Sequence, residues 1–320
     1  MRIKIKNEIN YSVIIPHKNT PILLQRCLHS IPRREDIQII IIDDNSEPEK
    51  VDFEQFPGLN DPSVEVIFTK EGKGAGYARN VGLAKAVGKW LLFADADDFF
   101  NYCINDIFDE YMNSSADIVY FKHNSVDSNT YITTYRGTGN NDRVNKWLYS
   151  IVKDDLLLRY RHLVVWSKLY RKEMIDKNNI LFDEISISND TTFAYLSGFY
   201  AISISADPRA LYCSTIRQGS IRQKKRNVEN RFDQFYVSCK RYWFFKKHNI
   251  PIHEKIPLVS FLVKFYLAGG SYFYNARSML KKFEFSLFEI IRLCGHDIMI
   301  YMPKLILKSS LIRNKLGKQL

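Results

Sequence analysis

The chain has 320 residues, of which 46% are hydrophobic and 25% are charged, as is ordinary for a folded globular protein with one large core and an appended region. The net charge of +11 is uneven, because residues 221–320 carry 20 Lys and Arg against 6 Asp and Glu, whereas residues 1–220 carry 26 against 29. We therefore predict a near-neutral body that holds the chemistry and a basic tail that meets an anionic partner.

The cysteines and the chain start bear on the compartment. The five cysteines form an odd, widely spaced set without a C-x-x-C pair, which argues for a reducing cytosol and against a structural zinc site. The first residues lack the apolar segment of a signal peptide, so a cytoplasmic protein is predicted. The longest near-apolar stretch, Ile256–Ala276, is interrupted by Lys264 and by Gly269-Gly270-Ser271, and is not expected to span a membrane.

Strand and helix patterns alternate through the first hundred residues. Apolar or β-branched runs at residues 11–15, 38–42, 64–68, 90–94 and 116–121 predict five strands, with the first ended by Pro16. Helical spacing follows the first strand at Leu24, Cys27, Leu28 and Ile31. A glycine-rich turn at 72–76 precedes a helix expected to carry Tyr77, Val81 and Ala84 on one face.

This alternation predicts an α/β fold, a doubly wound and mostly parallel sheet with helices on both faces. The predicted catalytic body spans residues 1–223, and residues 224–320 form a mainly helical, basic and aromatic-rich region.

Polar residues follow three of the predicted strands, at 17–19, 43–44 and 95–98. In open α/β sheets ligands bind beyond the carboxyl ends of the strands, so these groups indicate a nucleotide site. Three carboxylates within Asp95–Asp98 repel one another, and Mg²⁺ or Mn²⁺ shared with a diphosphate relieves such repulsion. A dinucleotide fingerprint fails on spacing, because its last glycine would fall on Tyr77 or Arg79.

Four blocks carry a resemblance to a known family. Residues 12–19 (SVIIPHKN), 42–46 (IDDNS), 76–82 (GYARNVG) and 93–98 (FADADD) resemble, in order and spacing, the family 2 glycosyltransferases with the GT-A fold. The likeness continues more loosely through residues 166–170, 182–184, 188–193 and 216–221.

The resemblance implies a base and ribose pocket. Pro16 and Asp44 would bracket a uracil, with Asp43 nearby, and Arg79 matches the family arginine that approaches the base. A carboxylate can accept a hydrogen bond from the imide N–H of uracil. Lys18 stands where the family usually has an aromatic residue.

The resemblance also implies a metal site at the acidic run. Asp95 is expected near the ribose and the metal, Asp97 as a ligand of Mn²⁺ or Mg²⁺ on the diphosphate, and Asp98 as a supporting acid. Arg217 and Arg222 fall in a segment similar to the family's substrate-covering loop and would contact the phosphates, or else they begin the basic tail.

The acceptor side is implied by later blocks. Asn189 and Asp190 occupy the place of the family's acidic pair, so Asp190 would act as general base on the acceptor hydroxyl and Asn189 would bind substrate. The alternative for Asp190 is an acid in the first turn of a helix. Trp166 and Lys168 are expected to line the acceptor side, although a Trp in such a block also suits a core.

The tail interleaves cations with aromatics, which suits a peripheral membrane anchor on anionic lipid or a helical subdomain with a solvated basic face. It lacks a nucleic-acid module, so no nucleic-acid partner is expected, and a homo-oligomer remains open.

Together these patterns predict an inverting, metal-dependent glycosyltransferase that uses a UDP-sugar and a glycan or lipid-linked acceptor in surface polysaccharide synthesis at the inner face of the cell membrane. The alternatives are a metal-dependent nucleotidyltransferase and a noncatalytic nucleotide-sugar-binding protein.

Overall fold

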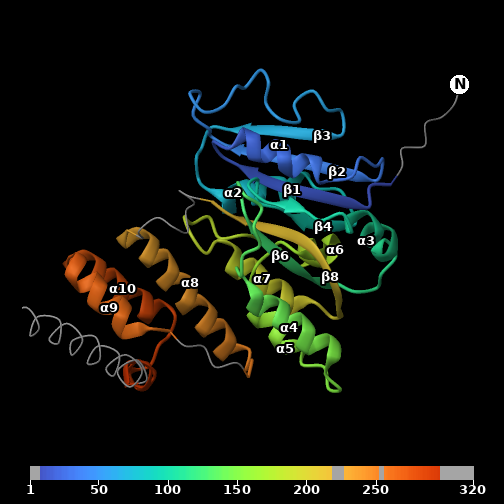
Figure 1. The fold of residues 1–320 in the computed structure, drawn as a ribbon. Helices are drawn as coiled ribbons and strands as arrows, with labels where there is room; N and C mark the ends of the chain where they lie inside the picture. Colours follow the sequence, from blue (N-terminus) through green and yellow to red (C-terminus); the bar gives the residue numbers. More distant parts are fainter. Residues whose placement is uncertain (1–7, 218–226, 252–255, 296–320) are drawn as a thin grey trace, which may run out of the picture. The chain divides into compact units, whose positions relative to one another are not determined.

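The computed structural model describes residues 8–217, 227–251 and 256–295 (Figure 1). The chain divides into two compact units, residues 1–224 and residues 225–320. Each unit is described by itself.

The first unit is built on one sheet. Its strand order is β3-β2-β1-β4-β7-β6-β8-β5, and β7 and β5 run against the other strands. The fold is therefore a mixed, mostly parallel α/β sheet, which confirms the predicted fold class. The strands are β1 (Tyr11–His17), β2 (Ile37–Asp44), β3 (Val64–Thr69), β4 (Trp90–Phe93), β5 (Phe99–Phe100), β6 (Ile118–Asp127), β7 (Lys168–Arg171) and β8 (Ile204–Ile216).

The first strand is longer than predicted. β1 continues through Pro16 to His17 and stays in register with β2. Ile14 accepts a hydrogen bond from Ala94 just past β4, and Pro16 two residues later faces the same side, where β4 has already ended. The missing N–H of a proline costs no ladder bond at such a place, so this proline does not end the strand.

Helices cover both faces of the sheet (Figure 1). Apolar residues of α1 and α3 pack in one core layer, and residues of α2 and α4–α7 pack in the other. The helices of this unit are α1 (Pro21–His29), α2 (Ala75–Lys85), α3 (Ile104–Tyr111), α4 (Thr138–Tyr149), α5 (Asp155–Arg161), α6 (Lys172–Lys177) and α7 (Asp190–Tyr200).

Helix α2 packs through small residues, which corrects the predicted face. Ala84 is exposed and Tyr77 only half-buried, whereas Gly76, Ala78 and Gly82 are buried. A methyl group added at Gly82 would collide with side chains of β1 and β2. The helix lies so close to the sheet that glycine, rather than a large apolar residue, fits the contact.

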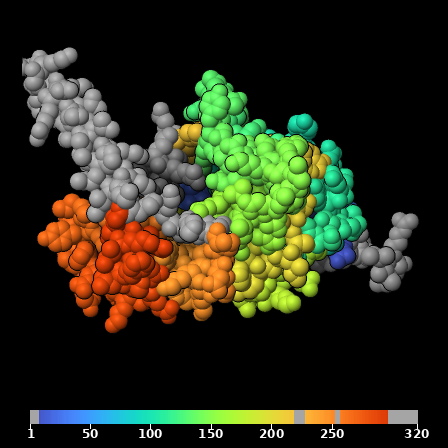
Figure 2. All heavy atoms as spheres, turned by 90° about the horizontal axis from the view of Figure 1, so that it is seen from below, coloured from blue at the N-terminus to red at the C-terminus, as the bar shows by residue number. Residues whose placement is uncertain are grey.

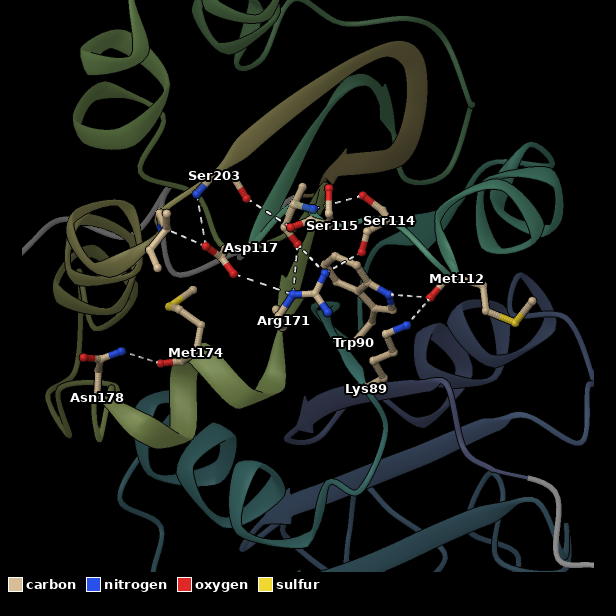
Figure 3. A network of polar contacts seen from close by, with 12 residues as sticks. Lys89, Trp90, Met112, Ser114, Ser115, Asp117, Arg171, Met174, Asn178 and Ser203 are labelled. Atoms are coloured by element: carbon tan, nitrogen blue, oxygen red, sulfur yellow. Dashed lines mark hydrogen bonds and ion pairs between the residues drawn. The ribbon is translucent and has the colours of Figure 1, made fainter.

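A polar network closes the end of the sheet opposite the acidic run (Figure 3). The Arg171 guanidinium at the end of β7 donates to the carbonyls of Ser114 and Ala116, and its Nε lies 3.6 Å from Asp117 Oδ1. Asp117 Oδ2 accepts the Ser203 amide at 3.1 Å. These bonds tie the segment before β6 to β7 and to the segment before β8.

The second unit has its own apolar core, formed by α8 (Val228–Lys247), α9 (Leu258–Ala268) and α10 (Gly270–Lys282). The space-filling view shows α9 and α10 in orange to red (Figure 2). Gly269, at φ +136°, separates α9 from α10 within the near-apolar stretch. Among the described residues, no helix has both the length and the apolar character that a membrane crossing requires.

Candidate active site

The polar residues that follow β1, β2 and β4 gather at one edge of the sheet. These three strands are neighbours and parallel, so their carboxyl ends meet there. The start of α2 and the start of α7 reach the same place, as the contacts below show. The strand-end arrangement predicted from the sequence is therefore present.

Asp43 anchors the end of β2. Its Oδ2 is 2.7 Å from His17 Nδ1, and its carboxylate also accepts bonds from the amide and hydroxyl of Ser46. His17 Nε2 accepts the Thr20 amide, which leaves Nδ1 as the donor to Asp43. Burial raises the pKa of Asp43, but the His17 and Ser46 bonds outweigh it and leave that pKa lowered. This acid supports the strand end.

Asp44, the next residue, has a different environment. Its Oδ2 accepts the Gly74 amide at 2.8 Å, and Lys18 Nζ lies 3.9 Å away. Its Oδ1 is buried without a hydrogen-bond partner among the described residues. Burial raises the pKa of Asp44 above its usual value. A buried carboxylate oxygen of this kind is costly unless a donor reaches it. Pro16, buried in β1, lies opposite Ile42 in register.

Arg79 joins the acidic run to the start of α7. Its Nη2 donates to Asp95 Oδ1 at 2.6 Å, and its Nη1 donates to Asn189 Oδ1 at 2.9 Å. The guanidinium is buried and lies 5.3 Å from the centroid of the Phe182 ring. Gly76 allows α2 to approach the backbone of Asp183 closely, because a Cβ at residue 76 would collide with the Asp183 carbonyl.

Asp97 lies between two arginines. The Asp97 side chain is 28% exposed, and its carboxylate accepts a 2.9 Å hydrogen bond from Arg217 Nε. Its backbone carbonyl accepts bonds from Arg26 Nη2 at 2.5 Å and from the Thr215 hydroxyl at 2.7 Å. The backbone is thus fixed while the carboxylate stays accessible. Arg222 lies outside the described residues.

Asp98 connects the acidic run to β8 through hydrogen bonds. Its oxygens accept the Thr215 amide at 2.6 Å and the Tyr212 hydroxyl at 3.0 Å, and the same hydroxyl accepts the Asp95 amide. Burial, with the nearby charges of Asp95 and Asp97, raises the pKa of Asp98 well above its usual value. The buried Asp98 therefore orders the loop.

Asn189 and Asp190 begin α7, Asn189 as its N-cap and Asp190 as its first residue. Both are partly exposed. The hydrogen bonds from Arg79 to Asn189 and to Asp95 link the start of α7 to the acidic run. The segment that carries the predicted base is therefore joined to one of the predicted metal ligands.

Trp166 and Lys168 do not line an open acceptor side. Trp166 is 4% exposed, and its ring stacks on that of Tyr212, which bonds to Asp98 of the acidic run, with centroids 5.1 Å apart. The Lys168 side chain is 2% exposed, and its Nζ donates to the His162 carbonyl at 2.7 Å. These positions correct the sequence-based placement, because apolar packing and burial remove both side chains from solvent.

Three supporting residues were missed in the sequence. Arg26 in α1 reads as an ordinary solvated helix residue, and Tyr212 and Thr215 lie in β8, which the sequence analysis did not predict. Their contacts with the acidic run join segments 71 to 118 residues apart. No local spacing signals such contacts.

The mixed, mostly parallel sheet with an acidic run at its carboxyl edge defines a GT-A-like α/β protein. Residues 12–178, just over half of the chain, match the family described as Glycosyl transferase family 2. The chain belongs to this family, which confirms the resemblance.

Two curated relatives and one solved structure illustrate the kinship. The chain is 28% identical over 196 residues to "Uncharacterized glycosyltransferase EpsJ" of Bacillus subtilis, covering 57% of this chain and 54% of that protein. It is 26% identical over 222 residues to "Poly(ribitol-phosphate) beta-N-acetylglucosaminyltransferase TarS" of Staphylococcus aureus, covering 66% of this chain and 36% of that protein. The chain thus spans only part of these relatives.

The crystal structure of S. aureus TarS 1-349 in complex with UDP-GlcNAc superposes with a TM-score of 0.60 at 20% identity. The superposition covers 90% of this chain and 80% of the TarS chain. At this identity the likeness shows the fold.

Proposed function

We propose that the protein is an inverting, metal-dependent glycosyltransferase that transfers a sugar from a UDP-sugar to a hydroxyl of a glycan or lipid-linked acceptor in surface polysaccharide synthesis. One observation carries the proposal: Arg79 connects Asp95 of the acidic run to Asn189, the neighbour of Asp190. Metal ligands and a base within one site are what a metal-assisted transfer to a hydroxyl requires.

Asp44 supports a donor substrate whose nucleotide base is uracil. Its buried, unpartnered Oδ1 is an acceptor that awaits a donor, and the imide N–H of uracil supplies one. The TarS crystal structure was obtained with UDP-GlcNAc, which makes that sugar nucleotide the first donor to test.

The carboxylates fit a divalent cation. Asp95 and Asp97 offer partly exposed oxygen ligands, 33% and 28% exposed, of the kind that Mg²⁺ and Mn²⁺ prefer. The described residues contain no group of three or more His, Cys, Asp or Glu arranged for a metal, so the proposal requires the diphosphate to complete the coordination of the cation. A bound cation would neutralise charge on the departing diphosphate. Arg217 brings a second positive group to the Asp97 carboxylate.

Asp190 has the role of general base in this proposal. A hydroxyl that attacks an anomeric carbon gains from proton removal, and a carboxylate at the site performs it. A single direct displacement inverts the configuration at that carbon, and it needs one base without a second, nucleophilic carboxylate.

The function is tested by a screen of UDP-sugars and other nucleotide sugars for release of the nucleoside diphosphate, with Mn²⁺, Mg²⁺ or EDTA. We expect metal-dependent release of UDP and product with inverted anomeric configuration. Accumulation of a nucleotide sugar from a sugar phosphate and UTP would instead identify a nucleotidyltransferase. Binding of UDP-sugars without turnover under all acceptors and metals would contradict the catalytic proposal.

Replacing Asp44 by Asn should weaken UDP binding. Asn retains an oxygen for the Gly74 amide but offers N–H where uracil also presents N–H. A lost hydrogen bond to a charged group is worth about 1.5–3 kcal/mol, so we expect UDP affinity to fall roughly tenfold to a hundredfold. CDP, whose N3 accepts a hydrogen bond, is the internal control and should lose less. Calorimetry that shows equal losses for UDP and CDP would contradict the pocket assignment.

We also propose that the protein associates with an anionic membrane surface. On α9 the exposed side chains of Val263, Tyr266 and Leu267 accompany the exposed cation Lys264. Apolar groups beside cations suit the interface of anionic lipid, where a lipid-linked acceptor lies.

Vesicles should therefore bind the full chain. We expect co-sedimentation with phosphatidylglycerol vesicles at low salt, less with phosphatidylcholine, and less after Val263→Ser with Leu267→Ser. Protein that stays in the supernatant with anionic vesicles would contradict membrane association and leave the transferase proposal unaffected.

A further inference from the structure

A buried lysine lies beneath the first turn of α7. Lys168 Nζ donates to the His162 carbonyl, and the ring centroids of Tyr120 and Tyr170 lie 4.8 and 5.8 Å from it. An ammonium carries three donors and a full charge. Burying such a charge is unfavourable unless an anion compensates it.

The geometry identifies Asp190 as that anion. Tyr170 stands two residues after Lys168 on β7, so both side chains leave the same face of the sheet. The Tyr170 ring packs on the Phe193 ring of α7, with centroids 5.3 Å apart. Phe193 lies three residues after Asp190, so the two share a face of α7. Asp190 therefore lies on the face of α7 that covers Lys168.

The electrostatics agree with this placement. Burial lowers the pKa of Lys168 to about 7, and the charge of Asp190 opposes the decrease. By the same attraction, a charged Lys168 favours the ionised form of Asp190. The lysine thus gains or loses its proton near neutral pH.

The other groups around Lys168 are neutral. Burial raises the pKa of Tyr120 and of Tyr170, from β6 and β7, and lowers the pKa of His162 well below its usual value. The charged groups next to this neutral shell are Arg79, which acts on Tyr170, Arg159 and Asp155, which act on Tyr120, and Arg143, which acts on His162. Both phenol oxygens and both His162 ring nitrogens are buried without hydrogen-bond partners in the described part of the chain. Such atoms are where ordered water is found.

We propose that Lys168 is a positioning residue for Asp190, whose buried ammonium keeps the carboxylate ionised and oriented toward the attacking hydroxyl, directly or through ordered water. The inference rests on the proposed function, because it gives the proposed base a partner. It replaces the predicted acceptor contact of Lys168, which its burial disfavours.

The test is the pH dependence of donor hydrolysis, in which water replaces the glycan acceptor. Lys168→Met removes the charge and keeps the stem, and Lys168→Arg restores a charge. We expect the acid limb of the Lys168→Met rate profile to move to higher pH by about one unit, with a roughly tenfold lower rate on that limb, and Lys168→Arg to recover part of it. A lysine that contacts only the acceptor would leave hydrolysis unchanged, and an unmoved profile overturns the proposal.

Lys89→Met is the matched control. Lys89 Nζ also donates to a backbone carbonyl, that of Met112 at 2.8 Å, beside the polar network at the opposite end of β4 (Figure 3). Its removal should leave the rate profile unmoved.

A second measurement remains valid if Lys168→Met does not fold. The attraction exists only while Lys168 is charged, so Asp190→Asn should lower the unfolding temperature more at pH 6 than at pH 9. An equal decrease at both pH values overturns the pairing. The comparison needs no turnover, so it tests the pairing of Lys168 with Asp190 separately: a wild-type protein that releases no UDP would overturn the proposed function and leave this pairing standing.

Discussion

Replacing Asp190 by Asn is expected to lower kcat for sugar transfer by about 10²–10⁴-fold, the range over which a positioned general base accelerates a reaction. Asn keeps the size of the side chain and the start of α7, but its amide takes no proton from the acceptor hydroxyl. In the proposed site Asp44 and the acidic run bind the donor and Asp190 does not, so the KM for the UDP-sugar should change little. Steady-state kinetics of UDP release with donor and acceptor measure both constants.

Glu173→Gln is the matched control for this variant. Glu173 is likewise an acid in the first turn of a helix, α6, and is exposed. The interaction of such an acid with the helix dipole is worth about 0.3–1 kcal/mol, so both variants lose a similar small stability from this source. If Asp190→Asn and Glu173→Gln both retain full activity, Asp190 serves its helix and is not the base.

Much of the sheet is predictable from local patterns. The β-branched run in β2 is buried on both faces, as a central parallel strand requires, and acids follow it because the chain leaves the sheet there. Three of the four sequence blocks reach the carboxyl ends of β1, β2 and β4, and the remaining block, residues 76–82, lies in α2.

The roles of adjacent acids are harder to predict. Asp43 and Asp44 are the same residue type on one strand, yet their side chains leave opposite faces of the sheet. Asp43 therefore meets His17 and Ser46, whereas Asp44 faces Gly74 and keeps one free oxygen. The sequence predicts both acids at the carboxyl end of β2, but the three-dimensional neighbours decide which one keeps an oxygen without a hydrogen-bond partner.

The burial of a charged side chain is harder still to predict from sequence. Lysine is almost never fully buried, so composition places Lys168 at the surface. Its position becomes clear only once β7 is known to lie between β4 and β6, under α7. The same long-range pairing brings Tyr212 of β8 to the acidic run.

Replacing Asp97 by Asn is expected to lower activity by roughly 10²-fold or more at a fixed Mn²⁺ concentration. Asn retains one oxygen ligand but loses the negative charge, and a catalytic cation contributes several kcal/mol, of which each 1.36 kcal/mol is a factor of ten in rate. The concentration of Mn²⁺ needed for half-maximal UDP release should rise. Electron paramagnetic resonance of free Mn²⁺, with UDP present, should show weaker metal binding independently of turnover.

The loss should not come from unfolding. The ion pair of Asp97 with Arg217 is partly exposed and contributes at most about 1 kcal/mol. Asp97 also repels the buried Asp98, since its charge is among the causes that raise the pKa of that group, so removing the charge relieves part of this repulsion. Asp106→Asn, at an exposed acid in the first turn of α3, serves as the control and should leave the Mn²⁺ dependence unchanged. An unaltered Mn²⁺ dependence in Asp97→Asn itself would remove Asp97 from the metal site and leave it a structural role through its bonds with Arg26, Thr215 and Arg217.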